Sequence, residues 1–372
     1  MSGRRVRVLF AGGGTGGHLF PGIAVAREIL AREPDADIAF VGTARGIETR
    51  AVPKEGFQLD VIRSAGLKGK SIAALARGVS LLPASAWDAW RVLSARRPDV
   101  VIGVGGYSSG PVVALAAARG IPTMVLEQNA VPGMTNRLLA RVVRAAAVTY
   151  DATLPYFGAR GFVSGNPVRP EFVARAADSA PAGARRGDHG AEARVLIFGG
   201  SQGAHAINVA MVEAAAELAA HARRLSITHQ TGERDLEFVR DGYRRAGVTA
   251  RVEPFIFEME REMTDADLVV CRAGATTLAE LTAAGRPAIL IPLPTATDDH
   301  QRKNARVLAE AGAAEVIDER GLTGAILARR LLALVDDEPR RARIAAAARQ
   351  FAKPEAARKI AQKALALAGG GR

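Results

Sequence analysis

The chain has 372 residues and a formal net charge of +12, and its length corresponds to about two domains. The single cysteine, Cys271, excludes a disulfide framework and suits a reducing compartment. The N-terminus lacks the pattern of a signal peptide, and no run approaches the ~18 apolar residues of a membrane-spanning helix. We therefore expect a cytoplasmic protein that is not integral to a membrane.

The basic excess indicates an anionic partner. The sequence contains no helix-turn-helix, zinc-ligand or ribonucleoprotein pattern, and aromatic residues make up only 5% of it, so base-stacking platforms are scarce. We expect no nucleic-acid partner and, by elimination, favour a membrane surface or a phosphate-bearing ligand.

Short apolar segments alternate with helical patterns along the chain, which is typical of a parallel sheet with helices on both faces. In the first half, strands are predicted at residues 6–11, 38–41, 100–104, 123–126 and 145–149. A helix is predicted at residues 21–32, where Pro21 suits an early helical position. Residues 174–193 lack periodicity and predict a linker or insertion. In the second half, strands are predicted at residues 195–198, 226–230, 250–253, 268–271 and 288–291.

The two halves resemble each other at their starts. Residues 8–18 align without gaps with residues 195–205, an offset of 187 residues. This repeat predicts an α/β protein of two facing, Rossmann-like, doubly wound domains, although any two strand–glycine-loop–helix units share this pattern. We place the domains at residues 1–165 and 194–350, with a linker or insertion at 166–193. A C-terminal helix, residues 351–372, is expected to pack back on the first domain.

The first glycine-rich loop, residues 12–17, fits G-x-G-x-x-G after a strand and before a helix, a pattern typical of phosphate binding. A dinucleotide site also requires an acid at the end of the second strand. That strand ends in Gly42 and Thr43, and Glu48 lies too far into the next element, which argues against NAD. His18 follows the loop and is a candidate general base, with local capping or packing as the alternative.

Further polar and glycine-rich segments follow other predicted strands, at the sheet edge where ligands bind. Residues 103–111 form a second glycine-rich loop or a plain turn, and residues 199–203 repeat the phosphate-loop pattern. Small residues at 272–277 open a helix that contains Glu280, which either binds ribose hydroxyls or interacts with the helix dipole. Gln301 and Asn304 are three residues apart and can face one ligand. No metal site is expected, since His and Cys lack zinc spacing.

The basic stretch, residues 63–97, combines positive charge with apolar residues. It holds one acid, Asp88, and both tryptophans, Trp87 and Trp90. Its basic residues are Arg63, Lys68, Lys70, Arg77, Arg91, Arg96 and Arg97. The pattern predicts a patch that binds an anionic membrane surface, or a core-facing helix pair with a solvated basic face.

Together these motifs resemble glycosyltransferase family 28, specifically the bacterial N-acetylglucosaminyltransferases that convert lipid I to lipid II. The resemblance covers residues 6–350, and it rests on residues 13–22, 105–111, 127–129, 136–137, 165–169, 199–204, 229–232, 271–280 and 300–305. It implies the two-domain GT-B fold, with the acceptor domain first and the UDP-sugar domain second. The chain departs from many relatives at His205, where they have Arg, and this puts a role for His205 in doubt.

The resemblance implies roles for individual residues. His18, Glu127 and Tyr107 are the expected catalytic residues, with His18 as the base and Glu127 orienting it or replacing it. The glycines expected at the acceptor diphosphate are Gly13, Gly14, Gly105 and Gly106. The residues expected to contact the donor are Thr15, Gly16, Gly17, Asn129, Arg169, Ser201, Gln202, Ile256, Ala275, Thr276, Thr277, Leu278, Ala279, Glu280, Gln301 and Asn304. Among these, Ser201 and Gln202 are expected at the diphosphate and Ile256 at the uracil.

The implied reaction is inverting transfer of N-acetylglucosamine from UDP-N-acetylglucosamine to the 4-hydroxyl of the acceptor's N-acetylmuramyl sugar. The acceptor is linked to undecaprenyl diphosphate, and no cofactor or metal is required. We expect a peripheral protein at the cytoplasmic face of the inner membrane. Two alternatives remain, a UDP-N-acetylglucosamine 2-epimerase, which shares the fold and donor, and a UDP-sugar-binding protein without turnover.

Overall fold

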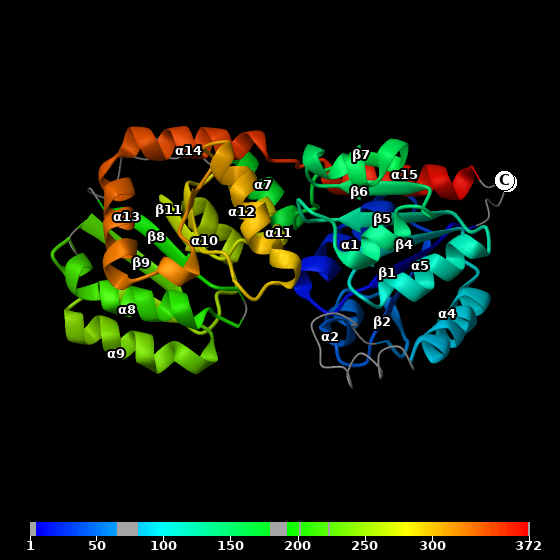
Figure 1. Cartoon of the computed structure of the whole chain (residues 1–372), viewed down its shortest axis with the longest axis horizontal. Coiled ribbons are helices and arrows are strands. Elements are labelled where there is room, and N and C mark those ends of the chain that lie inside the picture. Colours follow the sequence, from blue (N-terminus) through cyan, green and yellow to red (C-terminus); the bar gives the residue numbers. More distant parts are fainter. Residues whose placement is uncertain (1–4, 65–80, 179–191, 201, 222–223, 371–372) are drawn as a thin grey trace. The chain divides into compact units, whose positions relative to one another are not determined.

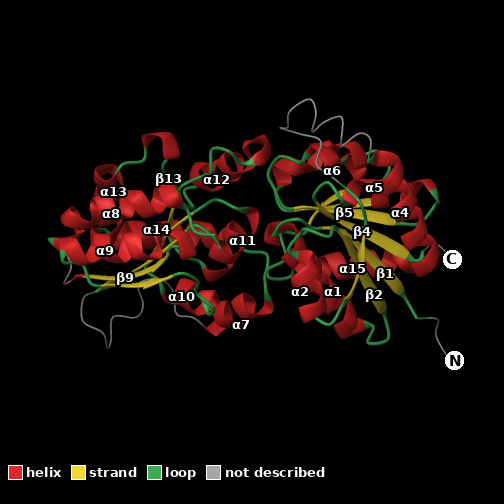
Figure 2. Cartoon of the chain, turned by 90° about the horizontal axis from the view of Figure 1, so that it is seen from below, coloured by secondary structure: helices red, strands yellow, loops and turns green. Residues whose placement is uncertain are grey.

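The computed structural model describes residues 5–64, 81–178, 192–200, 202–221 and 224–370. The chain divides into two compact units. The first comprises Met1–Arg169 and Lys353–Arg372, and the second comprises Pro170–Ala352. Each unit is an α/β layer structure with a parallel sheet between helices (Figures 1 and 2).

The sheet of the first unit has seven parallel strands in the order β3-β2-β1-β4-β5-β6-β7. The strands are β1 (Arg7–Gly12), β2 (Asp37–Gly42), β3 (Gln58–Val61), β4 (Val100–Gly105), β5 (Thr123–Glu127), β6 (Ala145–Val148) and β7 (Gly161–Val163). The strand order reverses between β1 and β4, which pair with each other. Ligands of doubly wound sheets bind at the carboxyl ends of the strands at such a reversal.

Helices cover both faces of this sheet. The helices are α1 (Gly16–Arg32), α2 (Glu48–Lys54), α4 (Leu82–Arg96), α5 (Ser109–Ala118), α6 (Met134–Leu139) and α15 (Ala356–Gly369). On one face, α1 packs against α15, and Ile360 of α15 joins the core cluster that contains Phe10 and Phe40. The C-terminal helix therefore packs back on the first domain, as the sequence predicts. On the other face, Leu93 and Val113 join the core from α4 and α5.

The sheet of the second unit has six parallel strands in the order β10-β9-β8-β11-β12-β13. The strands are β8 (Ala193–Phe198), β9 (Leu225–Gln230), β10 (Ala250–Glu253), β11 (Leu268–Cys271), β12 (Ala288–Leu290) and β13 (Glu315–Val316). The helices are α7 (Pro170–Asp178), α8 (His205–Ala219), α9 (Leu236–Ala246), α10 (Met259–Asp265), α11 (Ala275–Ala284), α12 (His300–Glu310), α13 (Gly324–Asp336) and α14 (Glu338–Gln350). Here the order reverses between β8 and β11, so both units carry the same type of ligand-binding edge.

The prediction of two Rossmann-like, doubly wound domains is confirmed, and the differences within each are local. The expected linker contains α7, which packs against α10 and α11. Strands β3, β7 and β13 were not predicted, because each is an edge strand that is short or only partly buried and so lacks a continuous apolar run. Helix α1 begins at Gly16, which places Pro21 inside the helix and not at its start. No helix within the described ranges is both long and apolar enough to cross a membrane.

Candidate active site

Two glycine-rich loops of the first unit lie against each other, after β1 and after β4. The backbone N–H of Gly13 donates to the carbonyl of Gly105 at 3.3 Å. A Cβ on Gly12 would lie 2.2 Å from the oxygen of Gly105, and a Cβ on Gly106 would lie 2.7 Å from the oxygen of Gly13. Only glycine permits this close backbone approach. The structure therefore brings together Gly13, Gly105 and Gly106, which are three of the four glycines that we predict at the acceptor diphosphate.

His18 lies in the first turn of α1, beside this loop pair. Its Nδ1 is 3.1 Å from the hydroxyl oxygen of Thr15. A Cβ on Gly105 would lie 2.6 Å from Cδ2 of the imidazole, so the ring packs directly over this glycine. The side chain is half-buried. Thr15 thus orients an imidazole at the carboxyl edge of the sheet, which is the arrangement that a general base requires.

Glu127 ends β5 and is almost completely buried, with 3% of its surface exposed. One carboxylate oxygen accepts the backbone and side-chain N–H groups of Asn129, and the other accepts N–H groups from Gly133 and Asn136. Burial raises the pKa of the carboxyl group, against the effect of these four donors. These contacts hold the segment that follows β5. Tyr107 is exposed, whereas Asn129 and Arg169 are half-buried.

Glu48 is the first residue of α2, and its side chain reaches the first glycine loop. Its Oε2 accepts the backbone N–H of Gly14 at 2.8 Å, and its Oε1 accepts the backbone N–H of Thr43 at 2.9 Å. Glu48 was considered only as the acid of a dinucleotide site, so its contact with this loop was not predicted. The loop that follows β2 folds back toward β1, and the sequence alone gives no sign of this.

The corresponding loop of the second unit follows β8. Ser201 lies outside the described residues, and Gln202 is exposed. A Cβ on Gly203 would lie 1.8 Å from the carbonyl oxygen of Thr231, so this loop also packs tightly on a neighbouring backbone. Gln230, at the end of β9, donates from Nε2 to the carbonyl of Gly200 at 2.9 Å. Its Oε1 accepts the backbone N–H of Ile256 at 2.7 Å.

Gln230 was not among the predicted donor residues, although it lies in a motif that carries the resemblance. It joins the loop predicted at the diphosphate to the residue predicted at the uracil. It is buried, with 2% of its surface exposed. The available signal was a long polar side chain at the carboxyl end of a predicted strand.

Gly16 and Gly17 are the first two residues of α1, and the remaining predicted donor residues lie in α11 and α12. Ala275, Thr276, Thr277 and Ala279 are half-buried, and Leu278 and Glu280 are buried. Gln301 accepts the backbone N–H groups of Ala273 and Leu293 with its side-chain oxygen, at 3.2 and 3.0 Å. Its amide orientation is thereby fixed. Asn304, three residues on, is completely buried. The structure therefore gives these two residues different environments, and their contact with sugar hydroxyls stays a prediction.

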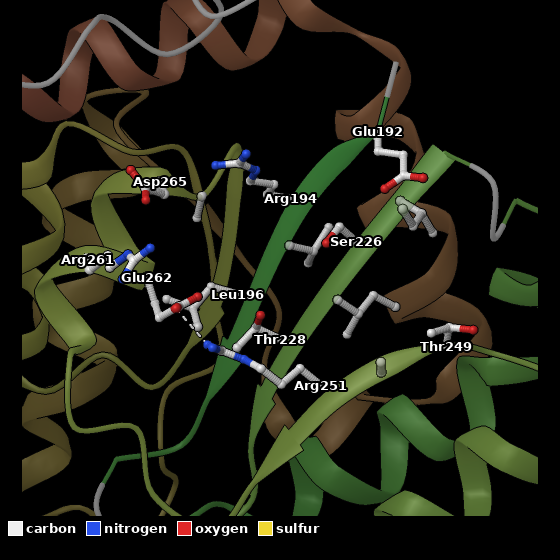
Figure 3. Close-up of a pocket in the computed structure, with 15 residues that line it drawn as sticks. Glu192, Arg194, Leu196, Ser226, Thr228, Thr249, Arg251, Arg261, Glu262 and Asp265 are labelled. Atoms are coloured by element: carbon white, nitrogen blue, oxygen red, sulfur yellow. Dashed lines mark ion pairs between the residues drawn. The ribbon is translucent and has the colours of Figure 1, made fainter. Parts of the chain in front are cut away.

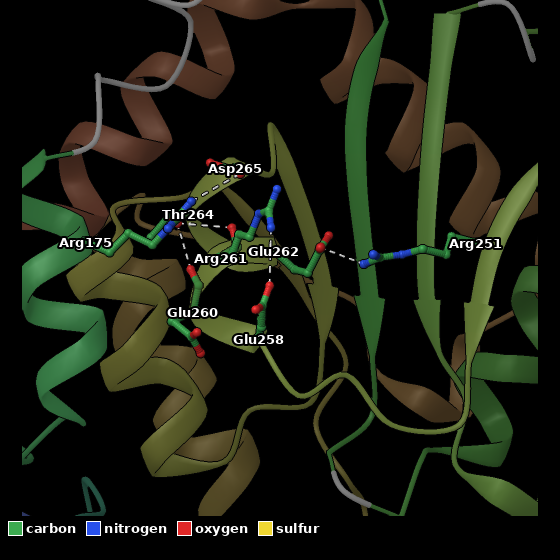
Figure 4. A network of polar contacts seen from close by, with 8 residues as sticks. All are labelled: Arg175, Arg251, Glu258, Glu260, Arg261, Glu262, Thr264 and Asp265. Atoms are coloured by element: carbon green, nitrogen blue, oxygen red, sulfur yellow. Dashed lines mark hydrogen bonds and ion pairs between the residues drawn. The ribbon is translucent and has the colours of Figure 1, made fainter.

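A cavity of about 650 Å³ lies at the other end of the second sheet, toward the amino ends of β8, β9 and β10 (Figure 3). None of its lining residues is a predicted site residue. Many of its charges are already paired. Arg251 pairs with Glu262 at 2.7 Å, and Arg175 donates to Thr264 and pairs with Asp265 (Figure 4). The cavity is thus separate from the carboxyl edge of this sheet, which carries the glycine-rich loop after β8.

Comparisons with known proteins agree with this layout. Family models of the glycosyltransferase family 28 N-terminal and C-terminal domains match residues 8–148 and 194–362. A relative from Anaeromyxobacter sp. (strain K) is 50% identical over 97% of this chain and 93% of its own length. It is named UDP-N-acetylglucosamine–N-acetylmuramyl-(pentapeptide) pyrophosphoryl-undecaprenol N-acetylglucosamine transferase.

Solved structures resemble the chain as well. The crystal structure of Acinetobacter baumannii MurG has a TM-score of 0.79 and 30% identity, and the match covers 97% of this chain and 99% of that one. The crystal structure of a putative UDP-N-acetylglucosamine 2-epimerase from Listeria monocytogenes has a TM-score of 0.67, and the match covers 99% of this chain and 98% of that one. Its identity is only 16%, so it shows the shared fold alone. The chain therefore belongs to glycosyltransferase family 28, and it is a glycosyltransferase.

Proposed function

We propose that this enzyme transfers N-acetylglucosamine from UDP-N-acetylglucosamine to the 4-hydroxyl of the N-acetylmuramyl sugar of lipid I, and so forms lipid II for peptidoglycan synthesis. The observation that carries the proposal is the 50% identity, over 97% of the chain, to a transferase named for this donor and acceptor. The epimerase alternative rests on a likeness of fold at 16% identity. It is therefore not favoured.

The second unit is proposed to bind the donor. The β8 loop and the start of α11 both lie at the carboxyl edge of the sheet, next to its strand reversal, and the first turn of a helix carries backbone N–H groups. Such groups and the α11 dipole favour a diphosphate. Glu280 and Ile256 are proposed to contact ribose and uracil, and Gln301, held by Ala273 and Leu293, to present its amide N–H groups to the sugar.

The first unit is proposed to bind the acceptor and to supply the base. His18 removes the proton from the 4-hydroxyl as its oxygen forms a bond to the anomeric carbon of the donor. The bond between that carbon and the diphosphate oxygen breaks, and UDP leaves with the electron pair. Inversion gives a β-1,4 linkage. Thr15 supports this assignment because its hydroxyl faces Nδ1 of His18, at 3.1 Å.

The proposal is tested by transfer of radiolabelled N-acetylglucosamine from UDP-N-acetylglucosamine to a short-chain lipid I analogue. We expect one labelled disaccharide product and one UDP released per transfer, with no UDP release when the acceptor is omitted. Formation of the 2-epimer from the donor alone would instead support the epimerase. Donor binding with neither product would support a binding protein without turnover.

Membrane association is proposed through the exposed part of the basic stretch. Trp87 and Trp90 are 57% and 46% exposed, and their rings stack with centroids 5.2 Å apart. The core side of α4 is formed instead by Ala89 and Leu93. Exposed tryptophans beside basic residues favour the interfacial alternative over a core role for these two side chains. Lys68, Lys70 and Arg77 lie outside the described residues. The proposed location is the cytoplasmic face of the inner membrane.

A further inference from the structure

We propose that Glu48 is a positioning residue for the transfer reaction, which holds the first glycine loop and, through it, the base His18. The link to catalysis rests on the proposed function. The contact between Glu48 and the loop is a property of the fold, and its effect on the loop can be measured independently of activity.

The carboxylate of Glu48 is completely buried, with 0% of its surface exposed. It accepts three hydrogen bonds. Oε2 accepts the N–H of Gly14 at 2.8 Å, and Oε1 accepts the N–H and the hydroxyl of Thr43 at 2.9 and 3.1 Å. A buried charge is tolerated only when such donors satisfy it. Glu48 therefore ties the loop after β1 to the loop after β2.

Three glycines make room for this carboxylate. A Cβ on Gly46 would lie 2.0 Å from Oε2, a Cβ on Gly42 would lie 2.5 Å from Cγ, and a Cβ on Gly13 would lie 2.8 Å from Cδ. Gly42 and Gly46 do not have the left-handed φ values that favour glycine, so backbone conformation does not explain them. Close packing against the Glu48 side chain explains why these two positions are glycine.

The position of the carboxylate changes the expected role of the loop. In a dinucleotide fold, the N–H groups of this loop bind a phosphate. Here the N–H of Gly14 already binds an anion of the chain itself. We infer that the acceptor diphosphate does not use this N–H, and that Gly14 serves to hold the loop.

The loop connects Glu48 to the base by a short path. Gly14 immediately precedes Thr15, whose hydroxyl faces Nδ1 of His18 at 3.1 Å. The carbonyl of Thr15 also accepts the backbone N–H groups of His18 and Leu19, and Thr15 is the N-cap of α1. A shift of Gly14 would therefore move both the orienting hydroxyl and the first turn that carries the imidazole.

The informative variant is Glu48→Gln. It preserves the size of the side chain but replaces one accepting oxygen by an NH2 group, which cannot accept from Gly14 or Thr43. Thr43→Val is a partner variant that removes only the hydroxyl bond and leaves the Gly14 bond in place. Asp99→Asn is the matched control, because Asp99 also accepts a backbone N–H, that of Arg7, but at the amino end of the same sheet.

Two measurements are made on each purified full-length variant. The first is hydrogen–deuterium exchange of the peptide that covers residues 12–18. The second is steady-state transfer, which gives kcat and the KM for the donor. We expect Glu48→Gln to speed exchange of this peptide and to lower kcat by about 10- to 100-fold, with little change in donor KM, because small misplacements of catalytic groups reduce kcat by such factors. Thr43→Val and Asp99→Asn are expected to leave the exchange of this peptide unchanged.

Unchanged exchange in Glu48→Gln would overturn the hold on the loop. Faster exchange with an unchanged kcat would overturn the positioning role. If Glu48→Gln does not fold, Glu48→Asp tests the same contacts, because its shorter side chain keeps the charge but withdraws from Gly14. If the wild-type enzyme transfers no sugar, the proposed function fails, and the exchange experiment still decides whether Glu48 holds the loop.

Discussion

The side-chain oxygen of Gln230 accepts the backbone N–H of Ile256 at 2.7 Å. The amide nitrogen of the same side chain donates to the carbonyl of Gly200 at 2.9 Å. One buried residue thus sets the distance between the proposed phosphate loop and the proposed uracil contact. We therefore expect donor affinity to depend on a side chain that need not touch the donor.

Replacement of Gln230 by Leu is therefore expected to weaken UDP binding. It removes both hydrogen bonds and leaves the N–H of Ile256 and the carbonyl of Gly200 without these partners. The variant must then order the loop and the Ile256 segment when UDP binds, and each ~1.4 kcal/mol of this cost weakens binding by a factor of ten. We expect the Kd for UDP, measured by calorimetry, to rise by about tenfold or more.

Gln128→Leu is the matched control for this variant. Gln128 is equally buried and donates to the carbonyl of Val104, but it lies in the first unit. Its replacement is expected to leave UDP affinity unchanged. Equal UDP affinity in wild type and Gln230→Leu would contradict the bridging role of Gln230.

Replacement of His18 by Ala is expected to reduce kcat by about 10²- to 10⁴-fold, the usual contribution of a general base. The donor KM should change little, because the donor is proposed to bind the second unit. Thr15→Val, which removes the oxygen that faces Nδ1, is expected to reduce kcat by a smaller factor. Steady-state transfer kinetics measure both effects. His221→Ala is the control, since His221 precedes β9 at the amino end of the other sheet; a kcat for His18→Ala that equals this control would exclude His18 as the base.

Replacement of Trp87 and Trp90 by Ala is expected to weaken binding to anionic vesicles. Burial of a large apolar side chain contributes about 1.5–3 kcal/mol, so the loss of both rings should reduce the partition coefficient by at least about tenfold. Co-sedimentation with vesicles of phosphatidylglycerol and phosphatidylcholine at low and high salt measures this. Tyr156→Ala is the control, because Tyr156 is an exposed aromatic residue of the same unit. Equal binding by the double variant and the control would refute the membrane role of the tryptophan pair.

The central strands of both sheets were predictable because they are buried on both faces and so form apolar runs. Strand β3 was not, since its four residues are exposed or half-buried at a sheet edge. Glu48 shows the other limit. The sequence places it 34 residues from Gly14, and only the return of the chain along β2 brings the two into contact.

The site was predictable in its loops but not in the roles within them. Helical spacing correctly places Gln301 and Asn304 on one side of α12, yet it does not reveal that Asn304 is completely buried. In the same way, Glu127 is expected to orient His18 or to replace it, but the residue pattern does not reveal that its carboxylate accepts from Asn129, Gly133 and Asn136. Hydrogen-bond partners depend on how separate segments pack together, and this packing cannot be read from local residue patterns.

A buried histidine predicts how the stability of the second unit depends on pH. His229 is completely buried, with Nε2 3.0 Å from Oδ1 of Asn208 and Nδ1 2.9 Å from the hydroxyl of Tyr243. The nitrogen of the Asn208 amide donates to Thr231 and to Asp235, so its oxygen faces the imidazole. Nε2 therefore carries the proton, and the Tyr243 hydroxyl donates to Nδ1. Burial lowers the pKa of His229 from 6.5 to about 3.

Because the pKa of His229 is lower in the folded state, the neutral ring contributes stability above pH 6.5 that is lost as the pH falls toward 3. Below pH 6.5, one such group lowers the free energy of unfolding by about 1.4 kcal/mol per pH unit, which amounts to about 2 kcal/mol at pH 5. We expect the free energy of unfolding, measured in urea at pH 7.5, 6.0 and 5.0, to fall less steeply in His229→Gln than in wild type. Tyr243→Phe retains the histidine and is expected to keep the steep dependence. Parallel pH profiles for wild type and His229→Gln would contradict this prediction, because they would show that the buried ring does not lower the stability in acid.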